Sequence, residues 1–221
     1  SHSGSAGKLQ YMFSGEHKNT RSFMDRDELH YDAASINTGE KAIENVIKEK
    51  ATSLNANLSY SFDGGSELRL NGLFEPSSRD RNEIQIETGT QPLHTVWDTL
   101  QEFDKWEVGG DYGRSLGNLG QFKALFVINR NKELKTVDRQ RDLDTANDFQ
   151  YAREITDLNK SEKILRASTT KSIFETQSLE VGGEVAINSF YKVFNDNRRA
   201  TTTDPLLLTT SDEVDIKENR Y

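Results

Sequence analysis

The chain has 221 residues, of which 33% are apolar and 29% charged, and its formal net charge is −8. A globular domain usually contains about 45–50% apolar residues, so this composition does not suit a large buried core. The net negative charge, without a basic face, excludes general nucleic-acid binding. The chain contains no cysteine, which excludes disulfides, thiolate metal sites and cysteine nucleophiles. It also lacks any run of 18 apolar residues, so no transmembrane helix is expected.

The beginning of the chain is polar and then starts to alternate. Residues 1–7, Ser-His-Ser-Gly-Ser-Ala-Gly, have the composition of a flexible linker and carry no signal peptide. Residues 8–17 alternate apolar and polar side chains and predict a first strand. The polar stretch 18–45 predicts an extension of that strand followed by a loop. Residues 39–50 are also compatible with a short helix.

The clearest pattern in the chain is the hairpin at residues 51–74. Apolar side chains alternate with polar ones from Leu54 to Phe62, and again from Leu68 to Phe74. The sequence Asp-Gly-Gly-Ser at 63–66 separates the two rows. Alternation on both sides of such a turn signal is the strongest short-range indication of a β-hairpin.

Two more hairpins repeat this design, around the turn at residues 116–120 and the connection at 172–178. The segment Trp-Glu-Val-Gly-Gly-Asp at 106–111 resembles Leu-Glu-Val-Gly-Gly-Glu at 179–184. Glycine in a strand marks a bend or a close approach, so we interpret this echo as architectural. The strands expected in total are residues 8–17, 46–62, 66–89, 103–115, 121–136, 151–170, 179–194 and 214–221.

The connections between the hairpins are long and polar, at about 75–104, 129–163 and 191–213. Short turns at one end and long loops at the other are typical of an outer-membrane barrel, with short periplasmic turns and long extracellular loops. Alternating segments of about 10 residues have the length that a tilted membrane strand needs. Aromatic residues gather near the short turns, as in the interfacial girdle of such a barrel: Tyr60, Phe62, Tyr112, Phe122 and Phe174. The predicted fold is therefore all-β, an antiparallel transmembrane β-barrel of which about eight strands are present.

In a barrel of this kind the apolar rows face lipid and the alternating polar rows face the lumen. The candidates for the lumen lining are the polar residues of the three hairpins: Asn55, Asn57, Ser59, Glu67, Arg69, Asn71, Glu107, Asp111, Arg166, Glu180 and Glu184. The carboxylate pairs Glu107/Asp111 and Glu180/Glu184 could serve as an acid and a base, but lumen-facing polar residues are the simpler interpretation.

Several features of these residues resemble the barrel of TonB-dependent outer-membrane receptors. They are the first strand Gly-Lys-Leu-Gln-Tyr-Met-Phe-Ser-Gly at 7–15, the Asp-Gly-Gly and Leu-Gly-Asn-Leu-Gly turns, and strands that continue above the membrane. The resemblance implies that residues 8–221 are the N-terminal part of a barrel of about 22 strands. It also implies a plug domain upstream in the same protein, the TonB complex as energy source, and a location in the outer membrane of a Gram-negative bacterium. The expected ligand is a scarce small molecule or glycan, such as a siderophore or a cobalamin-like compound.

Other classes remain open at this point. The same pattern suits a passive porin, a small structural outer-membrane barrel, or a soluble β-sandwich that binds a ligand. The four histidines are scattered without metal-ligand spacing, and no serine stands in a Gly-x-Ser-x-Gly elbow. We therefore expect no enzyme, no cofactor and no metal site.

Overall fold

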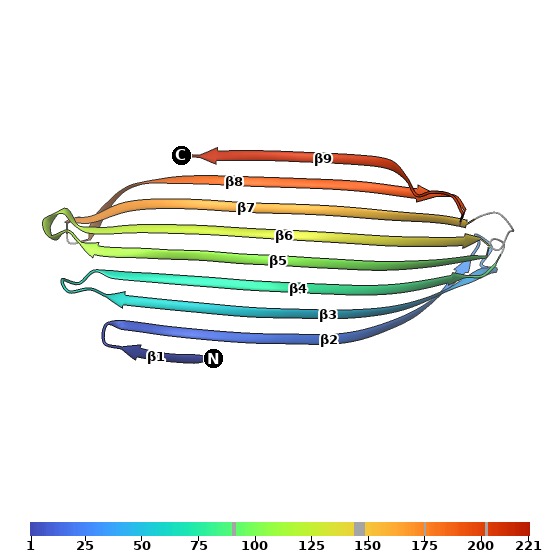
Figure 1. The fold of residues 1–221 in the computed structure, drawn as a ribbon, viewed down its shortest axis with the longest axis horizontal. Coiled ribbons are helices and arrows are strands. Elements are labelled where there is room, and N and C mark those ends of the chain that lie inside the picture. The colour runs from blue at the N-terminus through green and yellow to red at the C-terminus, as the bar shows by residue number, and fades with distance from the viewer. Residues whose placement is uncertain (90–91, 144–148, 175, 202) are drawn as a thin grey trace.

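A computed structural model describes residues 1–221 except 90–91, 144–148, 175 and 202. The described residues form one open antiparallel sheet in which every strand pairs with its neighbours in sequence (Figure 1). The elements are β1 His2–Ala6, β2 Leu9–Tyr31, β3 Asn37–Ser61, β4 Glu67–Glu87, β5 Leu93–Ser115, the 3₁₀ helix η1 Gly117–Leu119, β6 Gln121–Leu143, β7 Phe149–Phe174, β8 Gln177–Arg199 and β9 Leu207–Arg220. Among the described residues, no helix is long and apolar enough to cross a membrane.

The all-β prediction is confirmed, and so are the two best-marked turns. Phe62 donates its N–H to the Ser66 carbonyl oxygen at 2.8 Å, and Gly64 and Gly65 between them have φ values of 90° and 78°. Residues with a side chain rarely adopt such angles, which is why two glycines stand there. The second turn closes through the Leu116 N–H and the Gly120 carbonyl oxygen, also at 2.8 Å.

Three sequence predictions are wrong. The stretches 75–104, 129–163 and 191–213 are mostly strand and not long loops, because β4 and β5 are interrupted only between Glu87 and Leu93, and β8 and β9 only between Arg199 and Leu207. Residues 39–50 belong to β3 and not to a helix. Residues 2–6, expected in a linker, form β1 and make a ninth strand beside the eight that were expected.

The strands continue to pair in the stretches that were expected to be loops, because residues of opposite charge lie directly across the ladder from each other. Among the described residues, five ion pairs join strands directly in this region: Arg153–Asp138 at 2.7 Å, Lys41–Glu87 at 3.0 Å, Arg79–Glu49 at 3.2 Å, Lys48–Asp80 at 3.4 Å and Lys105–Glu75 at 3.6 Å. Opposite charges placed directly across a ladder stabilise the pairing. A charged stretch that looks like a loop in isolation can therefore be half of a strand pair.

Register divides the sheet into two faces, because residues paired across a ladder point to the same side. We call them the Leu58 face and the Asn57 face. Leu58 pairs with Tyr11 and Leu70, and Asn57 pairs with Met12 and Asn71. The described part of the chain forms a single sheet and not two packed layers, so the sandwich alternative does not apply.

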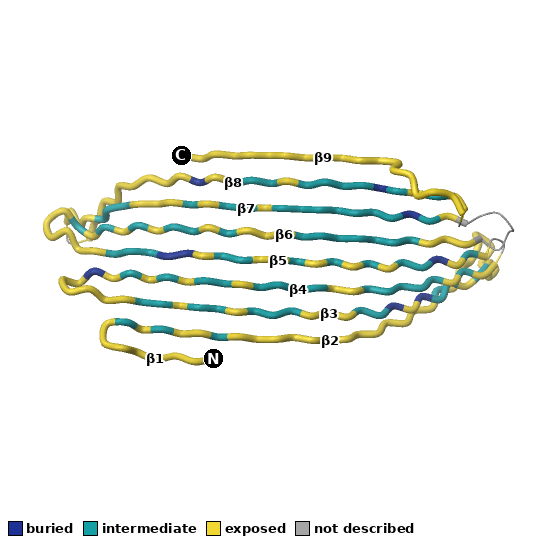
Figure 2. The backbone as a smooth tube through the Cα atoms, in the orientation of Figure 1, coloured by how far each residue is buried: buried dark blue, intermediate teal, exposed yellow. Residues whose placement is uncertain are grey.

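The two faces are buried to different extents. The buried side chains of Ile43, Asn45, Thr95, Ala152, Ala186 and Asp196 all lie on the Asn57 face (Figure 2). The other buried residues described are Ser66, which precedes β4, and the neighbouring glycines Gly109 and Gly110, which lie one on each face. Large apolar side chains on the Leu58 face stay exposed, for example Leu165 at 60% and Val181 at 66%. Side chains converge on the concave side of a curved sheet and diverge on the convex side. This distribution therefore indicates that the sheet curves with the Asn57 face inside.

Apolar residues on the Leu58 face form a dense band at one end of the strands, whereas toward the other end apolar residues such as Phe23, Ile84 and Leu100 are interspersed with charged ones. The band lies at the end with the turns at residues 62–66 and 116–120, which we call the tight-turn end (left in Figure 1). The apolar band consists of Leu9, Tyr11, Phe13, Leu54, Ala56, Leu58, Tyr60, Leu68, Leu70, Phe74, Trp106, Val108, Tyr112, Phe122, Ala124, Phe126, Ile128, Leu165, Ala167, Leu179, Val181, Val185 and Ile187. Beyond it, toward the other or distal end, the Leu58 face carries residues such as Asp104, Lys132 and Asp215.

The hairpin ends are staggered in a regular way. Gly113 is level in register with Ser61, the last residue of β3, but β5 continues to Ser115. Thr170 is level with Gln121, but the regular pairing of β7 with β8 continues to Ser172. Each of these hairpins thus extends about two residues further toward the tight turns than the preceding one. This is a shift of about one residue for each strand, and neighbouring strands are about 4.8 Å apart.

The glycine echo gives a direct test of packing in the apolar band. Gly110 and Gly183 both lie on the Leu58 face, in the two echoing segments. A Cβ atom at Gly110 would lie 2.7 Å from Leu70 Cδ2 and 2.8 Å from Phe126 Cε1, whereas a Cβ at Gly183 would meet nothing within 4 Å. The close approach expected from the echo is thus present at Gly110 and absent at Gly183.

We predict that Gly110→Val lowers the free energy of unfolding by about 1–3 kcal/mol, because overpacking displaces Leu70 and Phe126. Gly183→Val is the matched control and should leave stability unchanged or slightly higher. Urea titration of the two variants measures both values. Equal effects at the two positions would contradict the packing described for Gly110.

Candidate functional site

The structure places all eleven predicted lumen residues on the Asn57 face. Five of them follow one another across three strands, because Ser59 pairs with Arg69, Arg69 with Asp111, and Asn57 with Asn71. On the same face, but on the later strands β7 and β8, Arg166 pairs with Glu184. The remaining predicted residues lie an even number of positions from these along the same strands or pair with residues of the same face. They are Asn55, Glu67, Glu107 and Glu180. The alternation in sequence was sufficient to assign these residues to one face.

Most of the predicted residues on β3–β5 surround a cavity of about 590 Å³ near the tight-turn end. Asn57, Ser59, Arg69, Asn71 and Asp111 line it, together with residues of β2. Arg69 donates two hydrogen bonds to Asp111 Oδ1, from Nε at 3.1 Å and from Nη2 at 2.8 Å. Asp111 is therefore neutralised by an arginine and is not a free acid or base. The cavity presents amide, hydroxyl and paired ionic groups.

A second, smaller cavity of about 360 Å³ lies between β6, β7 and β8. It contains the predicted residues Arg166 and Glu180, whose Nη2 and Oε1 atoms are 3.5 Å apart, and it also contains Lys123 and Thr170. The other predicted residues lie outside both cavities. Glu67 accepts a hydrogen bond from Ser59 Oγ at 2.8 Å, and Asn55 donates one to Ser53 Oγ at 3.2 Å.

Each of the two cavities contains one arginine that is paired with a carboxylate, Arg69–Asp111 and Arg166–Glu180, and the smaller cavity also contains Lys123. In the described part of the chain, no group of three or more histidine, aspartate or glutamate side chains could hold a metal ion. Around these two cavities the Asn57 face therefore offers amide, hydroxyl and paired ionic groups.

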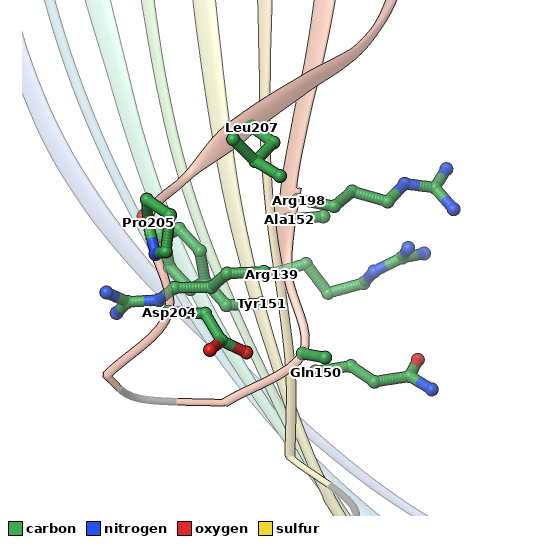
Figure 3. Close-up of a pocket in the computed structure, with 10 residues that line it drawn as sticks. Arg139, Gln150, Tyr151, Ala152, Arg198, Asp204, Pro205 and Leu207 are labelled. Carbon is green, nitrogen blue, oxygen red and sulfur yellow. The ribbon is translucent and has the colours of Figure 1, made fainter.

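A third cavity, of about 520 Å³, lies at the distal end of the sheet and was not predicted from the sequence (Figure 3). It is lined by Arg139, Gln150, Tyr151, Ala152, Arg198, Arg199, Ala200, Asp204, Pro205 and Leu207. Residues 129–148 belong to the stretch 129–163, which was expected to be a long polar connection. Arg139 and Arg141 were therefore not assigned to a face of the sheet. The available signal was the concentration of arginine in two short segments, at 139–141 and 198–199, in a chain of negative net charge.

A hydrogen-bonded cluster supports the wall of this distal cavity. Asp138 accepts hydrogen bonds from Tyr151 Oη at 2.5 Å and from Arg153 Nε and Nη2 at 2.7 and 3.1 Å. The guanidinium of Arg199 lies over the Tyr151 ring, 4.8 Å from its centroid. These contacts fix the orientation of Tyr151 between β6 and β8.

The same contacts shift the pKa values of the cluster. Burial alone would raise the pKa of Asp138, but the hydrogen bonds from Arg153 and Tyr151 outweigh it, and the pKa lies below its ordinary value. Burial and the Asp138 carboxylate both raise the pKa of Tyr151. The charged carboxylate and the neutral phenol are thus the forms that the folded chain favours.

The chain matches no protein-family model, no curated protein and no solved structure. The resemblance to TonB-dependent receptors therefore stays a prediction from the residues.

The distal cluster should weaken in acid. Because the pKa of Asp138 is lowered on folding, its contribution is complete above the ordinary aspartate pKa and is lost as pH falls through the lowered value. Asp138→Asn should remove about 1 kcal/mol of local stability at neutral pH, as expected for a partly exposed ionic pair. Backbone hydrogen exchange at residues 136–142 and 150–156 measures this loss.

Asp25→Asn, which changes an exposed carboxylate of β2, is the control and should leave that exchange unchanged. If exchange in Asp138→Asn matched the unmodified protein at neutral pH, the hydrogen-bonded cluster would not be what holds these strand ends.

Proposed function

We propose that the chain is part of an outer-membrane β-barrel that serves as a receptor and transporter for a scarce ligand. The observation that carries this proposal is the position of the apolar band. It spans seven to nine residues on β3–β6 and β8, five on β2 and three on β7, against the 9–11 residues that a tilted strand needs to cross the hydrocarbon layer. The strands β2–β8 themselves are 21–26 residues long. The apolar band faces lipid, and the distal halves extend into water.

The stagger of the hairpins supports the same proposal. If the hairpin ends lie at one level, a shift of about one residue per strand means about 3.3 Å along the strand for about 4.8 Å across, a tilt of about 35°. Strands of outer-membrane barrels tilt by about 35–45°. The upper edge of the apolar band moves in the same direction from β5 to β7, since Trp106, Ile128 and Leu165 are each one step lower than the one before, and it rises by one step on β8, at Ile187.

Aromatic residues stand at both borders of the apolar band, as the girdles of membrane barrels do. At the tight-turn border, Tyr60 and Tyr112 are both level with Leu68, and Phe62 contacts both rings. At the other border Phe74 pairs with Trp106. Only the first of these groups was expected from the sequence.

The position of β9 explains its polarity. Most of β9 pairs with the part of β8 beyond Ile187, the last residue of the apolar band, so Glu213, Asp215 and Lys217 on the Leu58 face lie above the hydrocarbon layer and meet water.

The long distal halves favour a receptor over a passive porin. A pore needs little more than the strand length that spans the membrane, whereas a receptor presents a tall wall that captures ligand above it. By the resemblance, a plug domain of the same protein fills the lumen against the Asn57 face, and the TonB complex supplies energy. The ligand is a small molecule or a glycan, and the location is the outer membrane of a Gram-negative bacterium.

The face assignment can be tested with single arginines. Leu58→Arg and Val181→Arg place a charge in the apolar band and should each lower the free energy of membrane folding by about 2–4 kcal/mol near the midplane. Asn57→Arg and Glu180→Arg, on the Asn57 face of the same strands, are the matched controls and should fold normally. Folding yields of the full-length protein in liposomes measure the difference, and equal yields for the two pairs would refute the lipid-facing assignment.

A further inference from the structure

We propose that three cations on β6 and β7, Arg130, Lys132 and Lys163, bind the phosphate groups of a membrane lipid. This inference rests on the proposed function, because it requires that the Leu58 face contacts lipid. We call the three residues the cationic patch. The chain as a whole has a formal net charge of −8, so a group of cations on one face is not a general property of its surface.

All three residues of the cationic patch lie on the Leu58 face, as the register shows. Lys163 pairs with Ile128 of the apolar band, and Arg130 and Lys132 follow Ile128 at steps of two residues along β6. Side chains two residues apart on a strand point to the same side of a sheet. The cationic patch and the apolar band therefore share one surface, on two strands that lie side by side (Figure 1).

The cationic patch lies at the border of the apolar band away from the tight turns. Lys163 is two residues beyond Leu165, where the band ends on β7, and Arg130 is two residues beyond Ile128, where it ends on β6. Two residues of a strand span about 7 Å. The headgroup layer on each side of a bilayer is about 5–8 Å thick, so both residues stand at the level of lipid phosphates. Lys132 is four residues beyond Ile128, and its flexible side chain can reach the same level.

The charges of the cationic patch are available for an anion. All three side chains are exposed and, among the described residues, none of them makes an ion pair. Arg130 donates a hydrogen bond from Nε to Asn159 Oδ1 at 3.0 Å, which orients the guanidinium while its terminal N–H groups have no carboxylate partner. Guanidinium and ammonium groups bind phosphate through charge-assisted hydrogen bonds. Phosphate is therefore the anion that suits this group of cations at this level.

Nearby carboxylates do not neutralise the cationic patch. Across the described strands, the three rows that contain it hold two carboxylates, Asp104 on β5 and Asp215 on β9. Asp104 is opposite Lys132 in the ladder but forms no ion pair with it, and Asp215 is 3.7 Å from Lys217 of its own strand. The positive charge of β6 and β7 at this level is thus left for an anion from the surrounding layer.

The row of Arg130 adds the uncharged groups that a lipid headgroup needs. Arg130 pairs with Ser161, which pairs with Ser189, and the two hydroxyl oxygens are 2.7 Å apart. On its other side Arg130 pairs with Trp106. Tryptophan is enriched at the headgroup level of membrane proteins because its ring is amphipathic. The row therefore combines an interfacial aromatic ring, a guanidinium and two hydroxyls.

The experiment identifies the lipid beside the cationic patch. Leu165→Cys carries a bimane fluorophore in the apolar band, two residues from Lys163, in the full-length protein reconstituted in vesicles of phosphatidylcholine. Lipids with brominated acyl chains quench the fluorophore on contact, so brominated phosphatidic acid and brominated phosphatidylcholine can be compared at this position. We expect phosphatidic acid to be preferred at least about 5-fold, because each basic residue near a membrane surface attracts anionic lipid.

Charge variants show which residues cause the preference. Replacing all three residues of the cationic patch with Gln should abolish it. The matched control, Lys135→Gln with Lys160→Gln and Lys192→Gln, removes the same number of charges from the Asn57 face of β6–β8 and should retain it. The same fluorophore at Leu54, in the row of Arg130 but on β3, should report little preference.

Three results with these variants would overturn the proposal. They are a preference that survives without the cationic patch, a preference that is also lost in the Asn57-face control, and an equal preference at Leu54. Displacement of the brominated phosphatidic acid by soluble glycerol phosphate would also overturn it, because the cationic patch would then bind free phosphate and not a lipid.

Brominated phosphatidylcholine separates this inference from the proposed function. If it quenches the fluorophore at Leu165, the apolar band contacts lipid, and equal quenching by the two lipids refutes only the phosphate site. If neither lipid quenches the fluorophore, the proposed function fails together with this inference.

Discussion

The constraint on which the rest of this structure depends is the pairing of long strands in a single layer. No second sheet or helix layer covers either face in the described residues, so a side chain's environment is decided by its face and its level along the strand. Backbone hydrogen bonds hold the layer together, and they tolerate any side chain whose cross-strand neighbour is compatible. This is why apolar pairs such as Leu58–Leu70 and ionic pairs such as Lys48–Asp80 can occupy the same two strands.

The two halves of the sheet are stabilised differently as a result. Near the tight turns the Leu58 face carries exposed apolar side chains that need an apolar surrounding, while the Asn57 face holds pairs such as Arg69–Asp111. In the distal half both faces mix charged residues with apolar ones such as Ile43 and Ile84, and ionic and hydrogen-bonded contacts such as the Asp138 cluster join neighbouring strands. The border between the two regimes steps toward the tight turns from β5 to β7, as the strand tilt of the proposed barrel would require.

Much of this could be predicted from the sequence where the pattern has period two. The hairpin at 51–74, its glycine turn and the common face of Asn57, Arg69 and Asp111 followed from alternation alone. The distal halves could not be predicted in the same way, because polar and apolar residues are mixed on both faces there and the alternation is lost. A segment such as 129–143 has the composition of a loop, and only its partners across the ladder show that it is a strand. The distal cavity depends on register between Arg139, Ala152 and Arg198, which are far apart in sequence, and so it was missed.

The most direct measurement uses the absence of native cysteine. Single cysteines placed at each position from 46 to 62 of β3 can carry a spin label, and collisions with lipid-soluble oxygen and a water-soluble nickel chelate report the surroundings of each label. The account predicts that oxygen exceeds the chelate at Leu54, Ala56, Leu58 and Tyr60, and that the chelate dominates at the residues between them. It also predicts that both faces contact water at 46–50. A chelate signal at every position would contradict the account, because the apolar band would then not face lipid.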